Sequence, residues 1–231
     1  MAGSVVPGFL PSVSGFRFPN AFARVPLRSI GVPGVIRMPI GDASNGLCGG
    51  MAFAARDYFE AGRPPPAQKT PPRSGALFDH LVNRLFDSFV LPRGPARYLE
   101  LMNPALPDGD PILRFLGIGP HGRAWRMLRE ELPRVRDEIL AGHPSPLGLV
   151  LVKSVNPFDL KLNHQVLAYG FEDEDRRVSI RVYDPNSPRR DDIAISLEGT
   201  DPRRPVTATL LPQGRRVHSF FRVGYRPAVP P

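Results

Sequence analysis

The chain contains one cysteine, Cys48, and its surroundings favour a nucleophilic thiol. It lies in the segment 45–51 (NGLCGGM), where a glycine-rich turn leads directly into an amphipathic helical pattern. The unpaired N–H groups and the dipole at a helix N-terminus lower the pKa of a thiol placed there. Glycine in the first turn of a helix costs about 1 kcal/mol relative to alanine. We therefore interpret Gly46, Gly49 and Gly50 as positions that another group approaches closely. The alternative is a small, buried, apolar cysteine.

Two polar residues further along the chain have the types that such a thiol needs. A thiol at neutral pH requires a base within hydrogen-bond reach and a third group that fixes the tautomer of the base. His164 begins the apolar strand pattern HQVLAYG, and Asp184 ends the next strand pattern at an Asp-Pro dipeptide. Antiparallel neighbours place the start of one strand beside the end of the next, so we expect the two side chains to be adjacent. The three residues together predict a Cys-His-Asp hydrolase, whereas the alternative for Asp184 is a turn cap.

Other constellations that carry chemistry are missing from the sequence. It has no phosphate-binding glycine loop followed by Lys-Ser or Lys-Thr, no Gly-x-Ser-x-Gly elbow, no His-Glu-x-x-His helix and no paired-cysteine metal site. We therefore expect no metal and no cofactor. We interpret the remaining histidines as surface or packing residues; they are His80, His121, His143 and His218.

The spacing of apolar residues predicts helices in the first part of the chain and strands in the second. Pro133 lies inside the fourth helical pattern and predicts a kink or a break there. The expected helices run from about Leu47 to Ala61 with Ser44 or Asn45 as N-cap, from Ser74 to Pro92, onward from Pro95, and from Trp125 to Ile139. The expected strands are 149–152, 165–171, 178–183, 193–197, 206–210 and 217–223. Helices followed by an antiparallel sheet are typical of an α+β domain.

Length and composition indicate one large domain with long ordered loops. The chain has 231 residues, of which 29 are proline and 22 are glycine. Residues 1–40 contain prolines throughout and no acidic residue, so we expect an extended, partly ordered arm there and a folded domain over 41–231. No signal peptide or run of about 18 apolar residues is recognised, so we expect a cytoplasmic protein without a membrane span.

The net charge of +8 raises the question of an anionic partner. Only three of the 30 basic residues are lysine, and the arginine pairs are scattered over separate turn-like segments. No recognised nucleic-acid module is present, so we expect general affinity for anions and no specific nucleic-acid partner. The sequence does not predict an oligomeric state.

The order and setting of the three candidate residues resemble the papain-like cysteine peptidase superfamily, in particular its bacterial branch related to bacteriocin-leader peptidases. The matching segments are 46–51 (GLCGGM), 164–170 (HQVLAYG) and 182–185 (VYDP). Cys48 and His164 are 116 residues apart, near the roughly 130 to 150 of the papain signature. The resemblance implies a papain-like α+β fold, with the nucleophile at a helix N-terminus packed on an antiparallel sheet. In it Cys48 is the nucleophile, His164 the general base and acid, and Asp184 the residue that orients His164.

The same resemblance does not decide which residue is the third member of the triad or which groups form the oxyanion hole. Papain has an asparagine in the third role, which makes Asn186 the alternative to Asp184. The family has a glutamine six residues before the cysteine as an oxyanion donor, but this chain has Asp42, whose carboxylate would repel an oxyanion. The hole is then expected from the backbone N–H of the cysteine plus Asn45 or Gln165, and losing one donor costs about 100 to 1,000 fold in rate.

We expect a peptide, protein or acyl substrate, with hydrolysis of a peptide or isopeptide bond through a thioester. One alternative is an acyl or aminoacyl transferase, because the same triad and thioester serve both reactions. The other is a binding protein that keeps the fold without turnover, which Asp42 favours.

Overall fold

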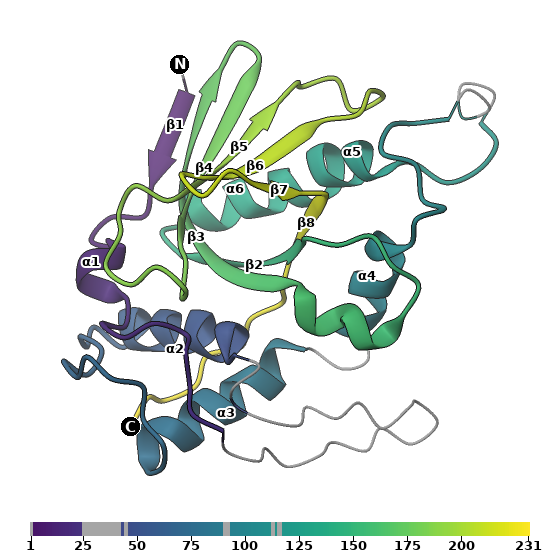
Figure 1. Cartoon of the computed structure of the whole chain (residues 1–231). Helices are drawn as coiled ribbons and strands as arrows, with labels where there is room; N and C mark the ends of the chain where they lie inside the picture. Colours follow the sequence, from purple (N-terminus) through teal and green to yellow (C-terminus); the bar gives the residue numbers. More distant parts are fainter. Residues whose placement is uncertain (1, 25–42, 44–45, 90–92, 112–113, 115–116) are drawn as a thin grey trace.

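An antiparallel sheet of eight strands forms the centre of the computed structural model (Figure 1). The structure describes residues 2–24, 43, 46–89, 93–111, 114 and 117–231. Its mixture of helices and a curled antiparallel sheet confirms the α+β class. The strands are β1 (Ala2–Val5), β2 (Ser145–Val150), β3 (His164–Glu174), β4 (Arg177–Tyr183), β5 (Ala194–Glu198), β6 (Thr207–Leu211), β7 (Arg215–Val217) and β8 (Ser219–Arg222). The helices are α1 (Pro11–Ser14), α2 (Cys48–Glu60), α3 (Ala76–Ser88), α4 (Arg93–Met102), α5 (Arg123–Trp125), a π-helix η3 (Arg126–Glu131), α6 (Leu132–Leu140) and a 3-10 helix η4 (Pro157–Leu162).

Strand β3 is the longest strand and the one on which the sheet is built. The strand order is β7-β6-β5-β4-β3-β2-β8, and β1 pairs with the second half of β3. Residues 164–171 of β3 are all buried, and both α2 and α6 pack against this strand. A strand buried on both faces has a nearly continuous apolar run, which residues 166–171 (VLAYGF) provide.

The last expected strand, 217–223, is in fact two strands on opposite edges of the sheet. β7 pairs with β6 at one edge, β8 pairs with β2 at the other, and only His218 separates the two. The backbone N–H of His218 donates to the carbonyl of Val150 at 2.8 Å. Since one residue spans only about 3.5 Å, the sheet must curl until its two edges meet.

Helix α2 is buried on all sides, although its sequence pattern predicted a single apolar face. Every residue from Gly49 to Tyr58 is buried, and the helix packs against both α3 and β3 (Figure 1). Its N-cap is Leu47, while the expected caps Ser44 and Asn45 lie outside the described residues. A helix that is buried all round needs apolar or paired residues on every side.

The observed starts of α3 and α4 differ from the expected ones, and the helical pattern around Pro133 is not broken. Gly75, at a φ of 87°, is the N-cap of α3 and takes the place expected for Ser74. Helix α4 begins at Arg93, before Pro95. The fourth pattern stays helical through Pro133, because the π-helix η3 precedes it and its hydrogen bonds skip one residue further, as from Leu132 N–H to the Met127 carbonyl.

The described part of the expected arm, residues 2–24, packs onto the core. β1 pairs antiparallel with β3, with Val5 opposite Gly170. Four aromatic side chains of the segment are buried; they are Phe9, Phe16, Phe18 and Phe22. Residues 25–42 lie outside the described residues. Among the residues that are described, no helix is long and apolar enough to cross a bilayer.

Some of the arginine side chains are buried and form hydrogen bonds inside the protein. Arg123 has only 1% of its side chain exposed. Its guanidinium donates to the carbonyls of Leu101 (2.8 Å) and Asn103 (2.6 Å) and to the carboxylate of Asp108 (2.9 Å). A planar guanidinium presents five donors, so one arginine fixes a loop that has few apolar residues of its own.

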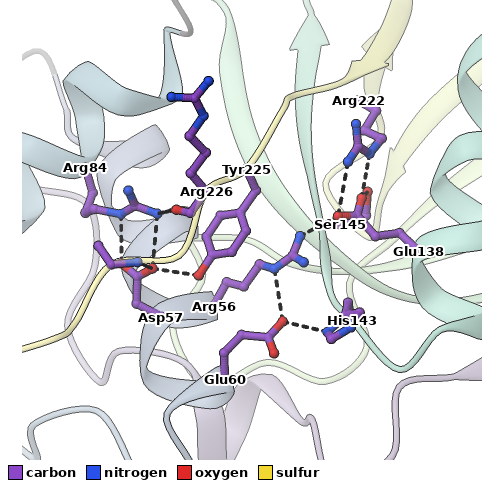
Figure 2. A network of polar contacts seen from close by, with 11 residues as sticks. Arg56, Asp57, Glu60, Arg84, Glu138, His143, Ser145, Arg222, Tyr225 and Arg226 are labelled. Atoms are coloured by element: carbon purple, nitrogen blue, oxygen red, sulfur yellow. Dashed lines mark hydrogen bonds and ion pairs between the residues drawn. The ribbon is translucent and has the colours of Figure 1, made fainter.

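A buried carboxylate, Asp57, joins α2 to α3 and to the C-terminal segment (Figure 2). Its Oδ1 accepts hydrogen bonds from Arg84 (3.0 Å), the hydroxyl of Tyr225 (2.6 Å) and the backbone N–H of Ala228 (3.2 Å). Its Oδ2 lies 2.8 Å from Arg84 Nε and 3.1 Å from His80 Nε2. A buried charge is tolerated only when it is paired and hydrogen-bonded, and Asp57 meets both conditions.

A second cluster in Figure 2 joins α2 to α6 and β8. Glu138 accepts from Arg56 (2.6 Å), from Arg222 (2.6 Å) and from the hydroxyl of Ser145 (2.7 Å). The two clusters lie on neighbouring residues of α2, Arg56 and Asp57, so they fix both the position and the rotation of this helix. Its N-terminal residue is Cys48.

We predict that Asp57→Ala lowers the free energy of unfolding by about 3 to 5 kcal/mol, because it leaves the Arg84 guanidinium buried without its partner. Urea denaturation measures the change. Asp79→Ala is the matched control, since Asp79 is an exposed aspartate on α3, and we expect it to cost about 1 kcal/mol or less. Equal losses in the two variants would contradict the structural role of the Asp57 cluster.

Candidate active site

The start of β3 and the end of β4 bring His164 and Asp184 together, as their places in the strand pattern predicted. His164 is the first residue of β3, and Asp184 directly follows β4, whose last residue Tyr183 is opposite Leu167. His164 Nε2 lies 2.7 Å from Asp184 Oδ1. Both side chains are buried, with 5% and 2% of the residue exposed. The carboxylate therefore holds one ring nitrogen in a site that water hardly reaches.

Cys48 is the first residue of α2, and the charge and hydrogen bonding of the neighbouring His164 imidazole act to lower the pKa of its thiol. Because Asp184 engages Nε2, the ring nitrogen that is left for the thiol is Nδ1. Hydrogen bonding from the backbone N–H groups of Gly49 and Gln165 acts on the pKa of the same thiol in the same direction. Cys48 is partly exposed, so a reagent can reach the sulfur although its partners are buried.

The electrostatics of the site favour a thiolate and an imidazolium. Burial raises the pKa of the Cys48 thiol, but the charge and hydrogen bond of His164 and the two backbone N–H groups outweigh burial and leave the pKa below its ordinary value. Burial lowers the pKa of His164, but the Cys48 thiolate and the Asp184 carboxylate together raise it to about 10. Burial also raises the pKa of Asp184, yet the hydrogen bond and charge of His164 hold it below its usual range. Each group thus favours the charged form of its neighbour.

The glycines beside Cys48 make room for other parts of the same chain. A Cβ at Gly50 would overlap the backbone carbonyl of Leu81 on α3. At Gly49 it would collide with the hydroxyl of Ser88 and lie 2.8 Å from Gln165 Oε1. We interpreted these glycines as positions of close approach, and the groups that approach them are protein atoms. These glycines are therefore explained by tight packing within the protein, and they do not indicate a substrate-binding site.

Of the two oxyanion candidates, Gln165 is described and Asn45 is not, nor is Asp42. The hydroxyl of the neighbouring Tyr98 donates to the backbone carbonyl of His164 at 3.1 Å, and the Oε1 of Gln165 is buried without a partner among the described residues. Gln165 thus acts on the thiol pKa through its backbone N–H, while its side chain packs beside Gly49. The remaining donor is the backbone N–H of Cys48, which as the first residue of α2 has no acceptor within the helix.

Asp184 is the better placed of the two candidates for the third role. Asn186 Nδ2 lies 3.3 Å from His164 Nε2, compared with 2.7 Å for the carboxylate of Asp184. The Asn186 Oδ1, which is the atom that would accept from an imidazolium, instead accepts from Asn20 Nδ2 at 3.2 Å. Sequence reasoning missed Asn20, because an asparagine after a proline in a loop looks like an ordinary turn residue.

Three of the four other histidines have side-chain partners elsewhere in the molecule. His80 belongs to the Asp57 cluster, and His143 contacts Glu60 at 2.8 Å. His121 lies beside Asp110 at 2.9 Å and stacks on Trp125 with ring centroids 3.6 Å apart; in His218, Nδ1 is buried without a partner among the described residues.

Within the described part of the chain, no group of three His, Cys, Asp or Glu side chains is arranged to hold a metal ion. Comparison with protein-family models, curated proteins and solved structures finds no match for the chain. The function proposed below therefore rests on the chemistry of the site itself.

We predict that alkylation of Cys48 by iodoacetamide depends only weakly on pH between 8 and 6. A free thiol loses about 80-fold in thiolate over this interval, because its pKa lies near 8.5. A lowered thiol pKa together with a His164 pKa of about 10 keeps the thiolate populated, so we expect a loss of less than about tenfold. Mass spectrometry of the quenched protein measures the rate. His164→Ala should return the profile to that of a free thiol, and an ordinary profile in the unaltered protein would refute the ion pair.

A second prediction separates the two candidates for the third role. Asp184→Ala removes the carboxylate that supports the imidazolium, so we expect alkylation at pH 6 to fall by about tenfold or more. Asn186→Ala should change the same rate by less than about threefold, since this side chain is exposed and presents its NH₂ group to His164. The reverse order of effects would assign the third role to Asn186.

Proposed function

We propose that the protein is a papain-like thiol hydrolase that cleaves a peptide or isopeptide bond with Cys48, His164 and Asp184. The observation that carries the proposal is the His164–Asp184 pair, with Nε2 and Oδ1 2.7 Å apart, beside Cys48: the imidazole lowers the pKa of the thiol, and the thiolate and carboxylate raise the pKa of the imidazole. Structural ion pairs also shift pKa values, but this one contains a partly exposed sulfur at a helix N-terminus.

The papain-like assignment is supported by layout and by the order of residues along the chain. The nucleophile begins a helix that packs against an antiparallel sheet, and the base and the carboxylate come from two neighbouring strands of that sheet. The hydrogen bond from Nε2 to a carboxylate leaves Nδ1 for the sulfur, which is a suitable arrangement for one histidine to act first as acid and then as base.

The proposed reaction begins with attack of the Cys48 thiolate on the carbonyl carbon of the scissile amide. The negative charge passes to the carbonyl oxygen, which the backbone N–H of Cys48 stabilises. The His164 imidazolium gives its Nδ1 proton to the leaving nitrogen, the C–N bond breaks, and an amine leaves behind a thioester on Cys48. Asp184 keeps the ring oriented during the transfer.

The second half of the reaction regenerates the ion pair. The neutral His164 takes a proton from water, and the resulting hydroxide attacks the thioester carbonyl. The C–S bond then breaks, which releases a carboxylic acid and restores the thiolate beside an imidazolium. If an amine takes the place of water, the same thioester gives a new amide, so hydrolysis and acyl transfer differ only in the nucleophile that is accepted.

The test uses p-nitrophenyl acetate, a small activated ester that reports the formation of an acyl-enzyme. We expect a burst of p-nitrophenol and a mass increase of one acetyl group at Cys48 in the unaltered protein. Cys48→Ala should abolish both, and His164→Ala should slow acylation by about 100 to 10,000 fold. His143→Ala is the matched control, because His143 is a half-exposed histidine bound to Glu60, and it should keep the full rate.

The outcomes separate the three functions. Acylation followed by release of acetate supports hydrolysis, whereas preferential capture of the acetyl group by added glycinamide supports a transferase. An unacylated Cys48, or a burst that survives Cys48→Ala, would leave a binding protein that keeps the fold without turnover.

A further inference from the structure

Asn20 connects the two loops that carry the nucleophile and the third member of the site. Its Oδ1 accepts from the backbone N–H of Leu47 at 2.6 Å, and Leu47 directly precedes Cys48. On the other side, its backbone N–H donates to the carbonyl of Pro185 at 2.9 Å. Its Nδ2 donates to Asn186 Oδ1 at 3.2 Å. One side chain therefore spans the gap between residues 47 and 186.

Gly46 shows how closely this contact is fitted. Gly46 has a φ of 93°, in the left-handed region that favours glycine. A Cβ on it would lie 2.7 Å from Asn20 Nδ2. Glycine at position 46, two residues before Cys48, is therefore required both by its backbone conformation and by the packing of Asn20 against it.

The backbone N–H of Leu47 fixes the orientation of the side-chain amides of Asn20 and Asn186. A backbone N–H can only donate, so the Asn20 oxygen must face Leu47 and its NH₂ group must face Asn186. Asn186 then has to turn its oxygen toward Asn20, which leaves its NH₂ group toward His164 Nε2. An NH₂ group cannot accept a hydrogen bond from the ring. Of Asn186 and Asp184, only Asp184 can therefore accept the proton on Nε2. Asn20 thus decides which neighbour of the imidazolium accepts its proton.

The segment that carries Asn20 is anchored on its N-terminal side. β1 pairs with β3, and Ser12 donates from its backbone N–H (2.8 Å) and its hydroxyl (2.7 Å) to the carboxylate of Asp191. Phe16 and Phe18 are fully buried, with ring centroids 5.2 Å apart. The position of Asn20 is therefore set by contacts of its own segment with the core as well as by the two loops.

We infer that Asn20 is a positioning residue of the site, which acts through Leu47 on the nucleophile and through Asn186 on the imidazole. The inference rests on the proposed function and adds a member to its machinery from the N-terminal segment. Loss of the amide leaves the N–H of the fully buried Leu47 without its acceptor. It also frees Asn186 to rotate, so that its oxygen competes with Asp184 for the Nε2 proton.

The experiment measures the pH profile of iodoacetamide labelling at Cys48 and the rate of acylation by p-nitrophenyl acetate. For Asn20→Ala we expect the acid limb of the profile to move upward by about one pH unit. Acylation should slow by about 10 to 100 fold, because small misplacement of a reacting pair has effects of this size. Asn20→Ser keeps an acceptor on a shorter side chain and should show a shift in the same direction.

Ser12→Ala is the matched control, since it removes a side-chain contact of the same segment without touching the site. It should leave both the profile and the acylation rate within about twofold. A folded Asn20→Ala or Asn20→Ser protein with an unchanged profile would overturn the inference. So would an equal shift in Ser12→Ala, which would mean that any loosening of the segment has the same effect. If the unaltered protein itself has an ordinary thiol profile, the proposed function fails, and this outcome is distinct from the other two.

Discussion

The site depends on one packing constraint, which is that the first turn of α2 fits between β3 and α3 with no space for a side-chain carbon. At Gly50 the helix meets the backbone of α3, and at Gly49 it meets Ser88 and Gln165. This contact places the Cys48 sulfur beside the first residues of β3. The Asp57 and Glu138 clusters act on the same helix from its other end and hold it in this position (Figure 2).

A buried ion pair is costly unless hydrogen bonds satisfy each partner, and both partners of the proposed pair have them. Backbone N–H groups of Gly49 and Gln165 lower the pKa of the thiol, and the imidazole is hydrogen-bonded to the Asp184 carboxylate. Asp184 in turn accepts the backbone N–H of Asn186 at 2.8 Å. The charge is thus spread over a strand start, a strand end and a helix tip, and none of these elements alone would stabilise it.

Much of the fold followed from patterns in the sequence, whereas several contacts of the site did not. The apolar spacing predicted α2, β3 and β4 closely, and the strand order then placed His164 beside Asp184. β1 was missed because prolines interrupt its surroundings, and the break at His218 was missed because 217–223 has one continuous strand pattern. The glycines around Cys48 were noticed for their cost, but their neighbours are set by tertiary packing. Asn20 had no local signal, because its partners are 27 and 166 residues away.

The separation of the site residues along the chain has a consequence during synthesis. Cys48 leaves the ribosome 116 residues before His164 and 136 before Asp184. Until β3 and β4 have paired, the sulfur has neither an imidazolium nor the Gln165 backbone N–H beside it, so the growing polypeptide carries a thiol of ordinary acidity. The proposed reactivity of Cys48 therefore requires that both β3 and β4 have been synthesised and have paired.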